Sequence, residues 1–265
     1  MKNQLIKVSS LALLITLVTA CGGDGDSKPA DANGVNVTNE GGGGVFTNDN
    51  EAAYTVSFTN LTYNQPMGPA AIILHAPGYN AFIDGQAASI AIEMLAESGS
   101  PDMLLDDAST SASYLSSMSS NGPTPPRAIS STATLSVPLL DVSDIQLSFA
   151  TMLVNTNDAF TALNAIDISN MTVGQSTSFM SPTWDSGTEA NLETAATIPG
   201  PIGGGEAAGF DAARDDLFDR VHFHGGVVTN ANATDASLEG LSTSILDETH
   251  RWNNPTAKIT ITRTR

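Results

Sequence analysis

Three acidic side chains in turn-like sequence are the strongest candidates for chemistry in this chain. Asp158 ends the segment NTND at 155–158, and Asp185 and Glu189 belong to the segment WDSGTEAN at 184–191. Each segment follows an expected strand, so both should leave a sheet where loops converge. Calcium takes about six to eight hard oxygen ligands, largely carboxylates, backbone carbonyls and water. The three carboxylates therefore predict a Ca2+ site, with Asp185 and Glu189 close enough in one turn to share the ion.

The same residues also have a reading without a metal. Asp and Asn are common in turns because their side chains bond to nearby backbone N–H groups. Gly187 would permit the tight backbone of a metal-binding turn, but glycine is equally common in turns that bind nothing. Spacing alone leaves both readings open.

A histidine pair is the second candidate. His222 and His224 alternate on an expected strand, which puts both imidazoles on one face. With His250 or Asp219 as a third ligand they could hold a transition metal, as in a metal-dependent hydrolase. The alternative, which we favour, is a solvated or hydrogen-bonded pair at a sheet surface.

Other catalytic patterns are missing from the sequence. It contains no Gly-x-Ser-x-Gly, His-Glu-x-x-His, P-loop or Cys-x-x-Cys motif. The only cysteine is Cys21, so a cysteine nucleophile and an internal disulfide are both excluded. We therefore expect a protein that binds rather than an enzyme. A purely structural component of the cell envelope is a further alternative.

Residues 1–21 look like a bacterial lipoprotein signal. Lys2 and Lys7 precede an apolar run at 11–18, and small residues lead to Cys21 in LVTAC. The run is too short to span a bilayer of about 30 Å. We expect lipidation of Cys21 and anchoring in the bacterial cell envelope, with the following Gly-Gly favouring the outer membrane. An ordinary signal peptide with a chance cysteine is the alternative.

Composition then divides the rest of the chain. Residues 22–51 are rich in Gly, Asp and Asn and predict a flexible tether, because they cannot bury enough apolar surface to fold. Residues 52–265 fit one β-rich domain. The formal net charge of −18 disfavours nucleic acid as a partner and favours divalent cations. An acidic surface that only maintains solubility would look the same.

Alternating apolar and polar residues predict strands with one buried face. The expected strands are 54–58, 71–75, 131–137, 145–149, 176–180 and 259–262. Many short strands between Gly, Pro and Asn turns predict an all-β fold with minor helices, arranged as an antiparallel β-sandwich.

Three helices are expected beside the sheets. The first covers 86–97, with Asp84 as its N-cap and Gly99 at its exit. The second begins at Ser100-Pro101, and the third covers 207–220 with Phe210, Leu217 and Val221 on one face.

Several segments resemble the spondin N-terminal domain, a module of extracellular matrix proteins and of bacterial secreted proteins. The matching segments are YTVSFTNLT at 54–62, MLVNTNDAF at 152–160, WDSGTEAN at 184–191 and NPTAKITI at 254–261. The bacterial branch also resembles NQPMGPAAIILHAPGY at 64–79 and IPGPIGGGE at 198–206. The resemblance covers most of 53–263.

This resemblance implies a C2-like β-sandwich with a calcium ion held by loop carboxylates. By position, the ligands correspond to Asp158, Asp185 and Glu189. Asn157 and Ala159 flank Asp158 where the animal domains have proline and tryptophan, Glu189 replaces an aspartate, and their cysteines are missing. The implied function is a membrane-anchored calcium-binding module for adhesion or ligand binding, whose ligand is an unidentified protein or glycan.

Overall fold

The computed structural model describes residues 35–36, 47–48, 50–203, 210–230 and 240–265. Cys21, the expected site of lipidation, lies outside these ranges. Strands β1 (Val35–Asn36) and β2 (Thr47–Asn48) form a two-stranded sheet of their own. The compact unit that carries the candidate site spans Asn48–Arg265.

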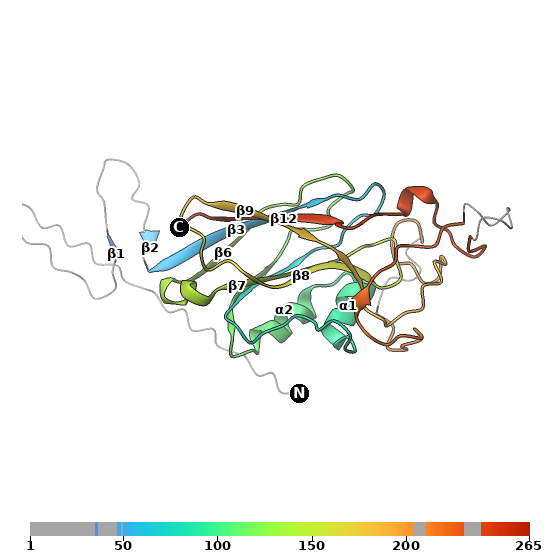
Figure 1. Cartoon of the computed structure of the whole chain (residues 1–265), viewed down its shortest axis with the longest axis horizontal. Helices are drawn as coiled ribbons and strands as arrows, with labels where there is room; N and C mark the ends of the chain where they lie inside the picture. Colours follow the sequence, from blue (N-terminus) through green and yellow to red (C-terminus); the bar gives the residue numbers. More distant parts are fainter. Residues whose placement is uncertain (1–34, 37–46, 49, 204–209, 231–239) are drawn as a thin grey trace, which may run out of the picture. The chain divides into compact units, whose positions relative to one another are not determined.

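That unit is an all-β sandwich of two antiparallel sheets, so the predicted fold class is confirmed (Figure 1). The larger sheet contains, in spatial order, β11 (His222–Phe223), β10 (Thr183–Asp185), β8 (Ala159–Asp167), β7 (Gln146–Met152), β4 (Ala71–His75) and β5 (Tyr114–Ser119). The smaller sheet contains β6 (Ala133–Pro138), β3 (Glu51–Asn60), β12 (Ala257–Arg263) and β9 (Ser176–Ser181).

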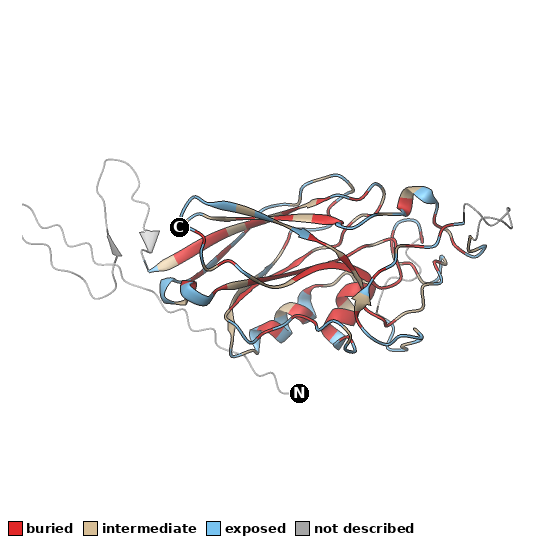
Figure 2. Ribbon diagram, viewed as in Figure 1, coloured by how far each residue is buried: buried red, intermediate tan, exposed pale blue. Residues whose placement is uncertain are grey.

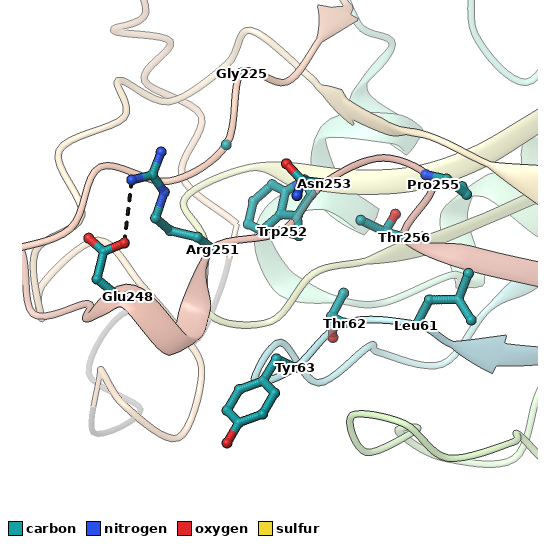
Figure 3. Close-up of a pocket in the computed structure, with 11 residues that line it drawn as sticks. Leu61, Thr62, Tyr63, Gly225, Glu248, Arg251, Trp252, Asn253, Pro255 and Thr256 are labelled. Carbon is teal, nitrogen blue, oxygen red and sulfur yellow. Dashed lines mark hydrogen bonds and ion pairs between the residues drawn. The ribbon is translucent and has the colours of Figure 1, made fainter.

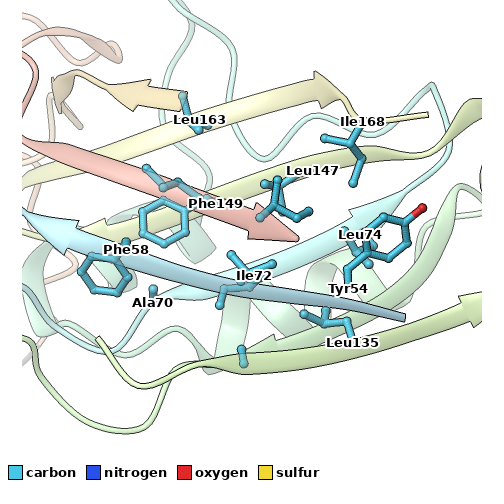
Figure 4. Close-up of a cluster of buried hydrophobic side chains, with 14 of the residues drawn as sticks. Tyr54, Phe58, Ala70, Ile72, Leu74, Leu135, Leu147, Phe149, Leu163 and Ile168 are labelled. Atoms are coloured by element: carbon cyan, nitrogen blue, oxygen red, sulfur yellow. The ribbon is translucent and has the colours of Figure 1, made fainter. Parts of the chain in front are cut away.

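The core between the sheets follows from strand alternation. In β3, Tyr54, Val56 and Phe58 are fully buried, whereas the intervening residues are only half-buried. Phe58 meets Phe149 of the other sheet edge-on, with ring centroids 5.2 Å apart (Figure 4). Each such side chain contributes about 1.5–3 kcal/mol to folding through removal from water. Only one register of β3 with its neighbouring strands therefore buries all the apolar residues on its inner face.

Two helices cover the outer face of the six-stranded sheet. They are α1 (Ile90–Ser98) and α2 (Asp102–Ser109), and two short 3-10 turns, η1 (Leu139–Asp144) and η2 (Glu248–His250), complete the described elements. Ile92, Leu95 and Leu104 pack with Ile73 and Phe160 in a second core. Because both faces of this sheet are covered, every residue of β4 is buried. None of the helices in the described ranges is long and apolar enough to cross a membrane.

The first helix begins four residues later than predicted. Ser89, not Asp84, is its N-cap, and the Ser89 hydroxyl accepts a hydrogen bond from the Ile92 N–H at 3.3 Å. Serine at this position satisfies one of the free N–H groups of the first turn. The predicted exit at Gly99 is confirmed, since Gly99 is the C-cap with φ of 72°.

The prediction of a third helix at 207–220 is wrong for its described part. Residues 210–220 contain no helix. Asp211 and Asp216 each accept a hydrogen bond from the backbone N–H two residues later, at 3.0 Å in both cases. Such side-chain bonds compete with helical bonds for the backbone. Leu217, expected on the apolar face, is fully exposed.

Burial extends from the strands into the loops at the end of the sandwich opposite the C-terminus (Figure 2). Many of the buried side chains there are polar or charged. They include Asn155, Asn157, Asp158, Asp185, Thr188, Glu193 and His224. A buried carboxylate requires a counter-charge, a proton or several hydrogen bonds, so these loops are the place to look for function.

Candidate functional site

Strand register brings Asp158 and Asp185 to adjacent strand ends. Asp185 is the last residue of β10 and pairs with Ala159, the first residue of β8. Asp158 immediately precedes β8, so the two aspartates lie next to one another at one edge of the six-stranded sheet. Both are essentially inaccessible to solvent. Burial, and then the charge of Asp185, raises the pKa of Asp158.

Asp158 uses one carboxylate oxygen to hold the turn that follows Asp185. Its Oδ2 accepts hydrogen bonds from the Ser186 hydroxyl at 2.7 Å, the Thr188 N–H at 2.8 Å and the Glu189 N–H at 3.1 Å. Its Oδ1 is buried and has no hydrogen-bond partner among the described residues. An unpaired buried carboxylate oxygen is costly, so this atom is the clearest indication of a missing ligand.

Asp185 is held by its own turn. Oδ1 accepts the Gly187 N–H at 2.8 Å, and Oδ2 accepts the Asn191 side-chain amide at 2.8 Å. Gly187 has φ of 71°, and a Cβ there would lie 2.5 Å from the backbone oxygens of Phe218 and Arg220. Only glycine fits between the WDSGTEAN turn and the 218–220 segment, for both conformational and steric reasons.

Glu189 lies between two acidic neighbours, Asp158 and Glu97 of α1. The Glu189 carboxylate accepts a long hydrogen bond from the Asn157 amide at 3.4 Å. Glu97 accepts the Asp211 N–H at 2.9 Å, and its buried Oε1 has no partner within the described chain. Burial, followed by the charge of Glu97, raises the pKa of Glu189 to about 8. Burial likewise raises the pKa of Glu97 to about 7.

Glu193 is a member of the site that the sequence did not predict. It is buried, with a left-handed backbone of φ 56°, a conformation that non-glycine residues adopt at an energetic cost. Its Oε1 accepts the Val228 N–H at 3.3 Å, whereas its buried Oε2 has no partner in the described ranges. Burial, then the charges of Asp158 and Asp185, raises the pKa of Glu193 to about 7. Nothing in the local sequence marks this glutamate as a ligand.

The two histidines share a face and both approach Asp185. His222 Nε2 and His224 Nε2 lie 3.9 and 3.7 Å from Asp185 Oδ2. His224 Nδ1 accepts the Gly226 N–H at 2.9 Å, so the proton of the neutral ring is on Nε2. His222 Nδ1 lies 2.9 Å from the Arg220 carbonyl and therefore carries its proton there. His224 therefore directs an N–H group at Asp185, whereas the neutral form of His222 directs a nitrogen lone pair at it.

The expected third ligands of the histidine pair are engaged elsewhere. His250 closes the η2 turn through Asp247, with Nδ1 and Oδ1 2.9 Å apart, and its Nε2 contacts the Asn64 amide at 3.0 Å. Asp219 pairs with Arg214 at 2.9 Å. The His224 tautomer also gives Nε2 a hydrogen rather than a free lone pair. A transition-metal site at these histidines would require His224 to lose the Nε2 proton and either His250 or Asp219 to leave its present partners.

The donor set at this end of the sandwich suits a hard cation. Buried oxygens that lack a partner in the described chain belong to Asn155, Asp158, Asn191 and Glu193, with Glu97 nearby. Carboxylate and amide oxygens are ligands that calcium prefers. No group of three or more His, Cys, Asp or Glu side chains among the described residues converges closely enough to hold a metal ion. Amide oxygens, backbone carbonyls, water or side-chain movement would therefore have to complete the coordination.

Comparison with known proteins adds no family to these observations. No family model matches the chain, and no curated protein matches its sequence. The function must therefore be argued from the site itself.

Proposed function

We propose that this protein is a calcium-stabilised β-sandwich that acts as a binding or adhesion module on the bacterial cell envelope. The observation that carries the proposal is the Asp158 carboxylate. One of its oxygens accepts four hydrogen bonds from the turn at 186–189, and the other is buried without a partner in the described part of the chain. A divalent cation would supply the contact that this oxygen lacks.

Asp158 and Asp185 are the proposed ligands, and Glu193 and Glu189 are further candidates that would have to approach them, since no three such side chains of the described residues already converge. Burial raises the pKa values of all four carboxyl groups, and neighbouring carboxylates add to this for Asp158, Glu189 and Glu193, so without a cation the four groups compete for protons. Calcium would neutralise the cluster and fix the loops that supply its ligands. The expected result is a rigid loop surface at one end of the sandwich, which suits recognition of a partner without turnover.

Membrane attachment is supported by the sequence of residues 1–21, with Cys21 as the lipidated residue. The proposed ligand is a protein or a glycan; a net charge of −18 disfavours nucleic acid. Two rival functions make different predictions. A purely structural envelope component would bind calcium without a partner, and a hydrolase built on His222 and His224 would bind a transition metal.

Thermal unfolding of the full chain with calcium, with EGTA and with zinc tests the proposal. Calcium at about 100 times its dissociation constant adds roughly 2.7 kcal/mol, equivalent to a midpoint shift of roughly 5–10 °C. Glu193→Gln should remove most of this shift. Asp144→Asn, at an exposed acid in η1 at the opposite end of β7 from the site, should keep it. No response to calcium, together with a zinc response that His222→Ala removes, would instead support the hydrolase.

A further inference from the structure

A groove with a volume of about 610 Å3 lies at the same end of the sandwich (Figure 3). The turn after β3 lines one side, the segment between η2 and β12 lines another, and Gly225 and Gly226 complete the wall. Its larger aromatic and polar lining residues are Tyr63, Glu248, Arg251, Trp252 and Asn253. This set, with the two glycines, is called the aromatic groove below.

The base of the aromatic groove is held by a buried polar network. Asn60 Oδ1 accepts hydrogen bonds from the Thr62 N–H at 3.0 Å and the Thr62 hydroxyl at 2.7 Å. Gln65 reaches across to the His250 carbonyl at 3.1 Å. All four residues are buried. The two sides of the groove are thus fixed relative to one another before any ligand arrives, which reduces the entropic cost of binding.

Two aromatic rings supply flat apolar surface in the groove. Trp252 is half-buried and packs against two hydrophobic clusters, so its ring is held in place. Tyr63 is 58% exposed, and the Arg127 guanidinium lies 4.6 Å from its ring centroid. Rigid aromatic side chains with a polar edge give large contact area at low entropic cost. Such faces suit the C–H side of a sugar ring.

The polar groups of the groove are balanced in charge. Arg251 and Glu248 form an ion pair at 3.4 Å, and their side chains are 60% and 51% exposed. Asn253 adds an exposed amide. These planar groups can bond to hydroxyls in both directions, as donors and as acceptors. With no net charge of its own, and set in a strongly acidic chain, the groove favours an uncharged ligand over an anionic one.

The glycine wall keeps the groove open. A Cβ added at Gly225 or Gly226 would meet no atom within 4 Å, so a side chain there would project into empty space. Gly226 has φ of 95°, a backbone that itself favours glycine, so only Gly225, whose φ lies outside that region, has no such conformational reason to be glycine. The missing side chains leave room for a ligand.

From this combination of one packed and one exposed aromatic ring, balanced polar groups and an open glycine wall, we propose that the aromatic groove binds a neutral oligosaccharide. This inference deepens the proposed binding function by naming the class of ligand. Only the coupling between the two sites through His224 depends on the calcium proposal.

The aromatic groove and the acidic site share His224. The His224 ring lies 5.2 Å from the Trp252 ring, its Nδ1 accepts the Gly226 N–H, and its Nε2 faces Asp185. A cation bound at Asp185 therefore acts, through His224, on two residues that line the groove, Trp252 and Gly226. Calcium and the oligosaccharide should each strengthen the binding of the other by the same factor.

The test is titration of the full chain with cellohexaose, maltohexaose and chitohexaose, followed by tryptophan fluorescence and calorimetry, in calcium and in EGTA. At least one of these should bind with a dissociation constant at or below about 1 mM. Tyr63→Ala and Gly225→Leu should each weaken binding about tenfold or more, the first by removing a ring and the second by filling the groove. Leu140→Ala, at an exposed side chain in η1 outside both the groove and the acidic site, should leave binding unchanged.

The inference is overturned if none of the three sugars binds, if both groove variants bind like wild type, or if oligogalacturonate binds as well as the neutral sugars. Equal sugar binding in calcium and EGTA keeps the groove assignment and contradicts only the link through His224. Sugar binding by a chain that shows no calcium binding would support the groove while refuting the calcium site.

Discussion

Asp158 and Asp185 lie side by side because Asp185 pairs with Ala159 across the β8–β10 ladder. Two buried carboxylates at adjacent strand ends repel one another, and folding tolerates them only with protons, hydrogen bonds or a cation. The turn from Ser186 to Glu189 satisfies one oxygen of Asp158 and leaves the other free of partners in the described chain. This relationship leads to several measurable consequences.

Asp158→Asn should stabilise the calcium-free protein while removing its response to calcium. The amide oxygen can still accept the bonds from Ser186 and Thr188, whereas the repulsion with Asp185 is lost. We expect the free energy of unfolding in EGTA to rise by about 1 kcal/mol. Denaturant unfolding in EGTA and in calcium measures both effects. A variant that is less stable in EGTA would show that the Asp158 charge already has a partner.

Stability without calcium should fall as pH rises from about 6.5 to 8.5. Glu97, Glu189 and Glu193 have pKa values raised to about 7, 8 and 7 in the folded chain. Their unfolded values are near 4.5, so the folded state holds more protons in this range and loses stability as they leave.

Calcium should flatten this pH dependence, because it replaces the protons. The lowered pKa of His224 acts in the opposite direction, but only below its unfolded value of 6.5, outside the chosen window. Chemical denaturation at several pH values, with EGTA or calcium, gives the two curves. Rising stability of the EGTA sample with pH would contradict the raised pKa values.

Gly187→Ala should destabilise the protein by about 2–3 kcal/mol or more, since it combines a left-handed backbone with contacts of 2.5 Å to the 218–220 backbone. Gly85 provides the control. It has φ of 77°, yet a Cβ there would meet nothing within 4 Å, so Gly85→Ala should cost only about 1 kcal/mol. Calcium affinity should fall in the first variant only. Equal costs would mean that the 218–220 segment does not press on the turn.

Arg214→Met should loosen the 210–220 segment from α1. Arg214 donates to Glu93 and to the Ala88 carbonyl, and Glu93 is almost fully buried. Loss of the cation leaves a buried carboxylate unpaired, at an expected cost of about 2 kcal/mol or more. Arg251→Met, which breaks an exposed pair, should cost less than about 1 kcal/mol.

The double variant Glu93→Gln, Arg214→Met separates charge from packing. Removing the buried carboxylate should recover most of the stability lost in Arg214→Met. If the double variant is as unstable as the single one, packing of the arginine chain, rather than its charge, holds the segment.

Strand alternation was sufficient to predict the sandwich, because β3, β6 and β12 of the smaller sheet each have one buried face. Tyr54, Val56 and Phe58 of β3 were predicted to share a buried face, and they do. The third helix was not predictable in the same way. Asp211 and Asp216 bond to nearby backbone N–H groups, and the segment is held by Arg214, which bonds to Glu93 more than a hundred residues earlier in the chain, a contact that local sequence cannot reveal.

The residues of the candidate site also fall into those that local sequence predicts and those that depend on long-range contacts. Asp158 and Asp185 could be chosen from sequence because each follows an apparent strand, and the structure places them together. Glu193 could not, because its role depends on a left-handed backbone and on a bond from Val228. Alternation correctly placed the two histidines on one face, but their tautomers depend on Gly226 and Arg220.

Calorimetric titration of the full chain with calcium at about pH 7, in buffers of different ionisation enthalpy, tests the central claim most directly. We expect one ion per chain and release of protons, because carboxylic acids with raised pKa values must ionise to bind it. Asp158→Asn should abolish the binding heat and Asp144→Asn should not. No binding heat, or calcium binding that persists in Asp158→Asn, would contradict the account.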